Sequence, residues 1–113
     1  MQNPAAIDLD VLESFIKENS GSGIDDISNL KESKVYVFHG TKDSINKVEA
    51  GQKAAELYTR VGADVRTQFW TLAEHGMVTK NYGSKCDEFK HPPAINNCGF
   101  DLAFEIIDHL TGE

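Results

Sequence analysis

The 113-residue sequence predicts an α/β fold, in which helices pack on a parallel sheet. Residues 34–39 (KVYVFH) and 64–72 (DVRTQFWTL) are rich in β-branched and aromatic side chains, which is typical of strands. Between them, residues 47–61 return to the apolar spacing of a helix. A strand–helix–strand unit with a connection of this length is almost always parallel and right-handed. The predicted order is helix, strand, helix, strand, long loop, helix.

The first helix is expected over residues 4–18, because apolar side chains recur there at helical spacing. They form two neighbouring rows, one of Ile7, Val11 and Phe15 and one of Leu9, Leu12 and Ile16. Asn3 followed by Pro4 favours a helix start, since a proline at the first helical position loses no N–H that the helix needs. Residues 19–26 (NSGSGIDD) contain two glycines and predict a loop.

The two predicted strands differ in pattern. The first is apolar along most of its length, which predicts burial on both faces, as in a parallel sheet. The second alternates Val65, Thr67 and Phe69 with Arg66 and Gln68, which indicates a half-exposed strand. Two strands leave two unpaired edges, and three amphipathic helices have little sheet to cover. We therefore expect residues 1–113 to form a single partial domain, one end of a larger sheet.

Each of the two later helices shows one apolar stripe. In residues 47–61 the stripe consists of Ala54, Leu57, Tyr58 and Val61. Gly62 is expected to cap the end of that helix. The last helix, residues 99–111, stops before Gly112 and has an apolar face formed by Phe100, Ala103, Phe104, Ile107 and Leu110.

Composition excludes several classes of protein. The net charge is -7, and the 11 basic residues are scattered, whereas a nucleic-acid-binding surface needs clustered Lys and Arg. No stretch approaches the roughly 20 apolar residues that span a bilayer. The first ten residues, MQNPAAIDLD, lack the basic and apolar regions of a secretory signal. We expect no nucleic-acid partner and no membrane span.

Cys86 and Cys98 lie together in a segment that contains Gly, Asn and Pro. One interpretation is a disulfide that closes a loop of about a dozen residues; the other is two free thiols in a reducing compartment. We favour the disulfide because neither cysteine belongs to an apolar helical or strand pattern, and it would indicate a secreted or extracytoplasmic location. Two cysteines with distant histidines do not have the spacing of a zinc site, and no metal or cofactor is expected.

Two chemically active side chains follow the two predicted strands. Asp43 comes a few residues after the first strand, and His75 comes just after the second. Functional groups of open α/β sheets collect beyond the carboxyl ends of the strands, so these two side chains are expected on the same rim. A carboxylate that accepts from one imidazole nitrogen leaves the other nitrogen as a general base. Asp43 and His75 thus have the chemistry of two members of a nucleophilic triad.

Several motifs resemble the carboxyl-terminal half of poly(3-hydroxybutyrate) depolymerases, which are esterases of the α/β-hydrolase superfamily. The resemblance covers Ile24 to Leu110, and its most specific stretches are VYVFHGTKDS (35–44), AEHGMVTKNYGSKC (73–86) and PPAINNCGFDLAFEIIDHL (92–110). It implies that Asp43 is the triad acid and His75 the triad base. It also implies that Cys86 and Cys98 form a bridged loop near the substrate cleft.

The same resemblance suggests further residues of the cleft. Met77, Asn81 and Tyr82 follow the histidine, where the family's cleft would lie. His39 closes the first strand and is expected to pack or bond beside the site. Trp70 ends the second strand, where sheet packing is the simpler interpretation and a contact with a polymer substrate is the alternative. His91 and His109 are expected to be solvated.

The nucleophile of the family sits in a G-x-S-x-G turn. None of the seven serines here has glycine at both of the second flanking positions, so whether the chain is an enzyme by itself stays open. We expect the carboxyl-terminal part of a serine carboxylic-ester hydrolase, inactive alone, whose intact form cleaves an ester or polyester. The alternative is a non-catalytic relative that self-associates, or binds a complementary amino-terminal half, through an exposed sheet edge.

Overall fold

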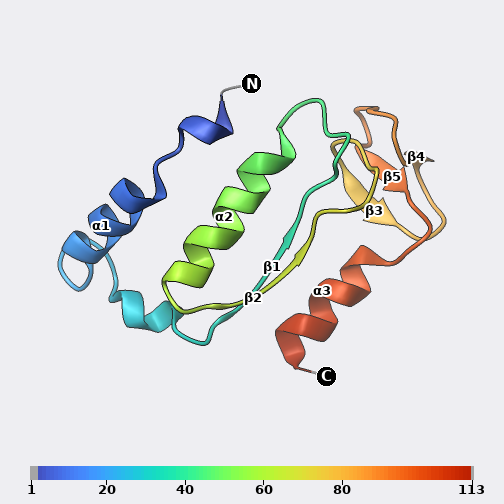
Figure 1. Cartoon of the computed structure of the whole chain (residues 1–113). Coiled ribbons are helices and arrows are strands. Elements are labelled where there is room, and N and C mark those ends of the chain that lie inside the picture. Colours follow the sequence, from blue (N-terminus) through green and yellow to red (C-terminus); the bar gives the residue numbers. More distant parts are fainter. Residues whose placement is uncertain (1–2, 113) are drawn as a thin grey trace.

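A computed structural model describes residues 3–112 and has an α/β architecture (Figure 1). Its centre is a pair of parallel strands, β1 (Lys34–Phe38) and β2 (Asp64–Gln68), joined by helix α2 (Val48–Arg60). Helix α2 packs against one side of this pair, and helix α3 (Leu102–Thr111) packs against the other. The strands therefore lie between α2 and α3. Helix α1 (Leu9–Asn19) packs on the outer side of α2.

The paired strands are parallel and in register from Lys34 opposite Asp64 to Phe38 opposite Gln68. Strand β2 is shorter than residues 64–72, the range that the sequence predicted. It ends because the side chain of Gln68 accepts hydrogen bonds from the backbone N–H and the hydroxyl of Thr71, at 3.3 and 2.8 Å, which turns the chain. Trp70 therefore lies outside the sheet and is 71% exposed, so the sheet-packing interpretation of Trp70 is wrong.

The amino-terminal helix begins later than the sequence predicted. A 3₁₀ turn, Pro4–Ala6, comes first, and α1 begins only after Asp8. The Asp8 carboxylate accepts hydrogen bonds from the N–H groups of Asp10 and Val11, at 3.0 and 3.3 Å, and so caps α1. The prediction of one helix over residues 4–18 is wrong at its start because Asn3 caps only the short turn, whereas Asp8 caps the α-helix.

The other two helices end where their glycines predicted. Helix α2 is followed by Gly62, with a φ of +92°, one residue beyond the cap residue Val61. Gly112, with a φ of +76°, caps α3. Both positions lie in the left-handed region, which glycine adopts without a steric penalty.

Helix α3 does not bury its apolar face. Phe104, Ile107 and Leu110 are 66, 60 and 48% exposed, whereas Leu102 and His109 are buried. The prediction that His109 is solvated is wrong: its Nε2 atom lies 3.0 Å from the carbonyl oxygen of Asp64, and its ring packs near that of Tyr36. This long-range hydrogen bond satisfies the imidazole, so the stripe of α3 that contains it can face the strands.

The segment that the sequence predicted as a long loop, residues 73–98, contains a second small sheet. Its strands are β3 (Met77–Thr79), β4 (Ser84–Lys85) and β5 (Ile95–Asn97), in the order β3-β5-β4 and all parallel. Strands of two or three residues are too short to show a period in the sequence. Cys86 and Cys98 form a disulfide across this region, as the sequence favoured.

A small apolar core joins the second sheet to α3 and β1. It consists of the fully buried residues Ala73, Val78 and Leu102, with Tyr36, Phe38, Phe100 and the disulfide packed around them. No helix within residues 3–112 is long and apolar enough to cross a bilayer. Ala73 of this core belongs to the segment between β2 and β3 that also carries His75, so the core anchors that segment.

Replacement of Val78 by Ala is expected to lower the free energy of unfolding by roughly 2 kcal/mol, because it removes two methyl groups from a packed site. Val78 is 1% exposed. Val11→Ala is the matched control: Val11 is 62% exposed, and its loss should stay within about 0.5 kcal/mol. Urea denaturation followed by circular dichroism measures both. Equal losses in the two variants would show that the core is not centred on Val78.

Candidate active site

The loops after β1 and β2 run side by side at the carboxyl ends of the strands. The backbone N–H of Thr41 donates to the carbonyl of Thr71, at 2.9 Å, and that of Lys42 donates to the carbonyl of Ala73, at 3.1 Å. Gly40 allows this approach, because a Cβ atom there would collide with the carbonyl of Ala73. The two loops thus carry Asp43 and His75 to the same rim, as the strand order predicted.

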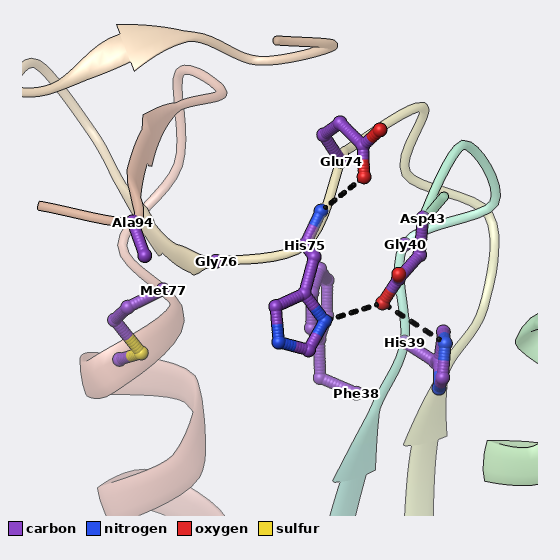
Figure 2. Close-up of a pocket in the computed structure, with 9 residues that line it drawn as sticks. All are labelled: Phe38, His39, Gly40, Asp43, Glu74, His75, Gly76, Met77 and Ala94. Atoms are coloured by element: carbon purple, nitrogen blue, oxygen red, sulfur yellow. Dashed lines mark hydrogen bonds and ion pairs between the residues drawn. The ribbon is translucent and has the colours of Figure 1, made fainter. Parts of the chain in front are cut away.

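The Asp43 carboxylate uses its two oxygens differently. Oδ1 accepts hydrogen bonds from the N–H groups of Ile45 and Asn46, both at 2.8 Å, and so closes the turn after β1. Oδ2 lies 2.9 Å from Nδ1 of His75 and 3.2 Å from Nε2 of His39 (Figure 2). Asp43 is therefore both the turn residue and the partner of an imidazole, the two interpretations that its sequence position allows.

Burial raises the pKa of Asp43, but the hydrogen bonds from Asn46, His75 and Ile45 outweigh it and hold that pKa below its ordinary value. The carboxylate is therefore ionised at neutral pH and can only accept hydrogen bonds. It follows that Nδ1 of His75 carries the proton. In the neutral imidazole the other nitrogen, Nε2, then has a free lone pair, and the side chain is 42% exposed.

His39 lies on the opposite side of Asp43 from His75 (Figure 2). Its Nε2 atom is 2.8 Å from the carbonyl oxygen of Asn46 as well as 3.2 Å from Asp43. Both neighbours are acceptors, so Nε2 holds the proton and donates. Gly51 of α2 makes room for the ring, since a Cβ atom there would lie 2.8 Å from Nδ1 of His39. His39 thus bonds beside the site, as the sequence predicted.

A cavity of about 380 Å³ opens at this rim, and its wall includes both histidines, Asp43, Met77 and Ala94. Met77, one of the predicted cleft residues, therefore lies beside His75. The structure places three other predicted cleft residues outside the lining of this cavity: Trp70, Asn81 and Tyr82. Tyr82 is 65% exposed and borders a separate hollow beside Gly83. Their part in substrate binding stays a prediction.

Glu74 is a residue of the site that the sequence analysis missed. It is only 8% exposed, and one of its oxygens, Oε1, lies 2.7 Å from the N–H of Ser44 and 2.7 Å from the N–H of His75. Burial and the charge of Asp43 raise the pKa of Glu74, but the hydrogen bonds from Ser44 and His75 outweigh them and lower it. The signal in the sequence was an acidic residue directly before the histidine, in AEHG.

The residues between 3 and 112 contain no group of three or more His, Cys, Asp or Glu side chains arranged to hold a metal ion. The two histidines and the carboxylate of Asp43 are instead paired with each other and with backbone groups. What this arrangement provides is an oriented imidazole at the edge of an open cavity.

No family model matches the chain. Its sequence is 38% identical, over 115 residues, to a poly(3-hydroxybutyrate) depolymerase of Delftia acidovorans. The chain is thus similar to one part of a poly(3-hydroxybutyrate) depolymerase. The match covers 99% of the chain and 23% of the relative, so the chain spans about a quarter of that protein. The resemblance to the carboxyl-terminal part of these depolymerases, predicted from the motifs, is confirmed.

The fold is also similar to that of a solved PHB depolymerase, in which a serine is replaced by alanine and which is in complex with an R3HB trimer. The TM-score is 0.84 at 21% sequence identity, over 94% of this chain and 35% of the solved one. This match confirms the predicted α/β fold of the chain.

Acid is expected to destabilise the chain through Asp43 and Glu74. Folding holds both pKa values below their ordinary values of 3.8 and 4.5. Both carboxylates therefore stabilise the fold above those values, and this contribution is lost as the pH falls through the lower, folded pKa values. Urea denaturation at neutral pH and at about pH 5, 4 and 3 measures the loss.

Glu74→Gln should make the fall in stability below about pH 4.5 shallower, because it removes one of the two carboxylates. The exposed Glu18→Gln is the matched control and should leave the slope unchanged. The same slope in Glu74→Gln and the unmodified chain would contradict the assignment.

Proposed function

We propose that this chain supplies the acid and the base of a serine ester hydrolase of the poly(3-hydroxybutyrate) depolymerase type. The observation that carries the proposal is the distance of 2.9 Å between Oδ2 of Asp43 and Nδ1 of His75, at the wall of an open cavity. This contact fixes the tautomer in which Nε2 of His75 is free to accept a proton. The sequence relationship to a depolymerase supports ester hydrolysis as the reaction.

In this mechanism Nε2 of His75 takes the proton of a serine hydroxyl as that oxygen attacks the ester carbonyl carbon. The imidazolium ion that forms is stabilised by the ionised Asp43, which does not itself become protonated. His75 then gives the proton to the leaving alcohol oxygen as the ester C–O bond breaks, leaving an acyl-enzyme. In the second half it takes a proton from water as the water oxygen attacks the acyl carbon. It then returns this proton to the serine oxygen as the acyl–serine bond breaks and the acid leaves.

The serine of this reaction would come from polypeptide outside these 113 residues. None of the seven serines present lies in a G-x-S-x-G turn, which exposes the nucleophile and supplies an oxyanion donor. The solved protein of similar fold, at 35% coverage, is bound to an R3HB trimer. We therefore propose esters of 3-hydroxybutyrate, as oligomers or polymer, as the substrate class of the assembled hydrolase.

A chimera tests this proposal: the chain replaces the matched 115 residues of the Delftia acidovorans depolymerase. We expect the chimera to hydrolyse p-nitrophenyl butyrate and poly(3-hydroxybutyrate). His75→Ala in the chimera should lower kcat by roughly 10³-fold or more, because it removes the general base. Asp43→Ala should also lower kcat strongly, because no carboxylate then holds the proton of His75 on Nδ1.

His91→Ala is the matched control, because His91 lies in an exposed loop away from the cavity, and its kcat should be unchanged. The isolated chain should show the same background rate as its own His75→Ala variant. Turnover by the isolated chain that His75→Ala abolishes would overturn the claim that the serine lies elsewhere. An active chimera that tolerates His75→Ala would overturn the proposed base.

A second candidate function is association with another polypeptide, and the exposed apolar face of α3 favours it. Phe104, Ile107 and Leu110 form this face, and each is at least 48% exposed. Within residues 3–112 the main sheet has only the strands β1 and β2, so each keeps one free edge. Unpaired edges and apolar faces are surfaces on which another chain docks.

Ile107→Glu should abolish such association, because it places a charge in the centre of the α3 face. Sedimentation velocity over a range of concentrations measures it. Val11→Glu on α1 is the matched control, because Val11 is 62% exposed and Ile107 is 60% exposed. It should leave the mass distribution unchanged. A chain that stays monomeric at every concentration would contradict association between copies.

A further inference from the structure

Glu74 is a buried charge that the proposed mechanism does not use. It lies between β2 and β3 and is 8% exposed, although charged side chains are rarely buried without a specific partner. Its partners are two backbone N–H groups, those of Ser44 and His75, and a single oxygen, Oε1, accepts from both at 2.7 Å. One carboxylate oxygen therefore joins two loops that lie 30 residues apart in the sequence.

These two N–H groups belong to the segments that carry the acid and the base. Ser44 directly follows Asp43, and the other N–H is that of His75 itself. The hydrogen bonds within the Asp43 turn, from Ile45 and Asn46, set the shape of that loop but not its distance from the next one. The Glu74 oxygen joins the two loops next to the hydrogen bond between Asp43 and His75. Figure 2 shows its bond with the N–H of His75.

The backbone of Glu74 is itself held in place from a third segment. Its N–H donates to the carbonyl of Cys86 at 2.9 Å, and Cys86 is bonded to Cys98. The disulfide segment thus fixes the start of the side chain, and the two N–H groups fix its end. A side chain anchored at both ends can transmit the position of one loop to another, which a flexible exposed glutamate cannot.

We propose that Glu74 is a positioning residue that sets the separation of Asp43 and His75 by accepting the backbone N–H groups of both loops through one oxygen. The inference rests on the proposed function of Asp43 and His75, and it adds a residue that touches neither the substrate nor the transferred proton. Without the shared acceptor, two N–H groups beside the dyad lose their partner, and the nearest remaining backbone bonds between the loops are those of Thr41 and Lys42.

The test uses the ring nitrogens of His75, whose ¹⁵N chemical shifts report which nitrogen carries the proton. The measurement is made on the isolated chain in alkaline buffer, at about pH 9, and compares the two neutral tautomers of the ring. The unmodified chain should show the Nδ1–H tautomer, because Asp43 accepts from Nδ1. Glu74→Met keeps the volume without an acceptor and should shift His75 to a mixture of the two tautomers. Glu74→Gln keeps an acceptor oxygen and should retain Nδ1–H.

Glu105→Met is the matched control, because Glu105 is a half-buried glutamate whose carboxylate accepts from the hydroxyl of Tyr36, at 3.3 Å, away from the two loops. It should retain the Nδ1–H tautomer of His75. A retained Nδ1–H tautomer in Glu74→Met would overturn the proposal. So would an equal loss in Glu74→Met and Glu74→Gln, because the amide oxygen of glutamine preserves the acceptor.

A second measurement needs no substitution, in case Glu74→Met does not fold. In an acid titration of the unmodified chain, the amide signals of Ser44 and His75 should move together with the side-chain carboxyl carbon of Glu74, because both N–H groups bond it. The amides of Ile45 and Asn46 should instead follow the carboxyl carbon of Asp43. If the amide signals of Ser44 and His75 do not move with the carboxyl carbon of Glu74, the proposal that both N–H groups share this acceptor is overturned.

Neither the tautomer measurement nor the acid titration depends on ester hydrolysis. The positioning role of Glu74 and the proposed function can therefore be refuted independently of each other. An inactive chimera together with a tautomer shift in Glu74→Met would overturn the proposed function and leave the positioning role. In an active chimera Glu74→Met should lower kcat by up to about 100-fold, the effect of a displacement of about 1 Å, while KM changes little. Unchanged kcat in that variant would overturn the positioning role and leave the proposed function.

Discussion

The site depends on the divided hydrogen bonding of the Asp43 carboxylate. One oxygen accepts from the backbone at Ile45 and Asn46, and the other lies against His75 and His39. Because the same group shapes the loop and orients the imidazole, the loop cannot change its turn without moving the hydrogen bond to His75. The Asp43 side chain therefore both closes the turn after β1 and orients the ring of His75.

The surrounding structure keeps the partner loop within reach of this carboxylate. Gly40 allows the loop after β1 to pass the carbonyl of Ala73 closely, and the N–H of Lys42 donates to that carbonyl. Val78 and Leu102 are buried in an apolar core that connects β3 to α3. The small sheet and its disulfide thus act as a rigid support for one side of the site, which is a larger role than that of a connecting loop.

The sequence predicted the parts of this arrangement that depend on local pattern. The β-branched run at 34–39 and the helical spacing of 47–61 were enough to predict a parallel pair, and the ends of its strands placed Asp43 and His75 on one rim. It could not predict interactions that join distant residues. Glu74 binds an N–H group 30 residues away, and His109 is buried because the carbonyl of Asp64, 45 residues away, satisfies its ring. The apolar stripe predicted for α3 contains Phe104, Ile107 and Leu110, which are exposed, whereas Leu102 and His109 are the buried residues of this helix.

The strand–helix–strand unit has a consequence for how such a site is inherited. Asp43 follows β1, His75 follows β2, and only α2 lies between the strands. One uninterrupted stretch, residues 34–75, therefore encodes both partners of the hydrogen bond and the geometry that joins them. In evolution, an exchange of that whole stretch would move Asp43 and His75 as a unit.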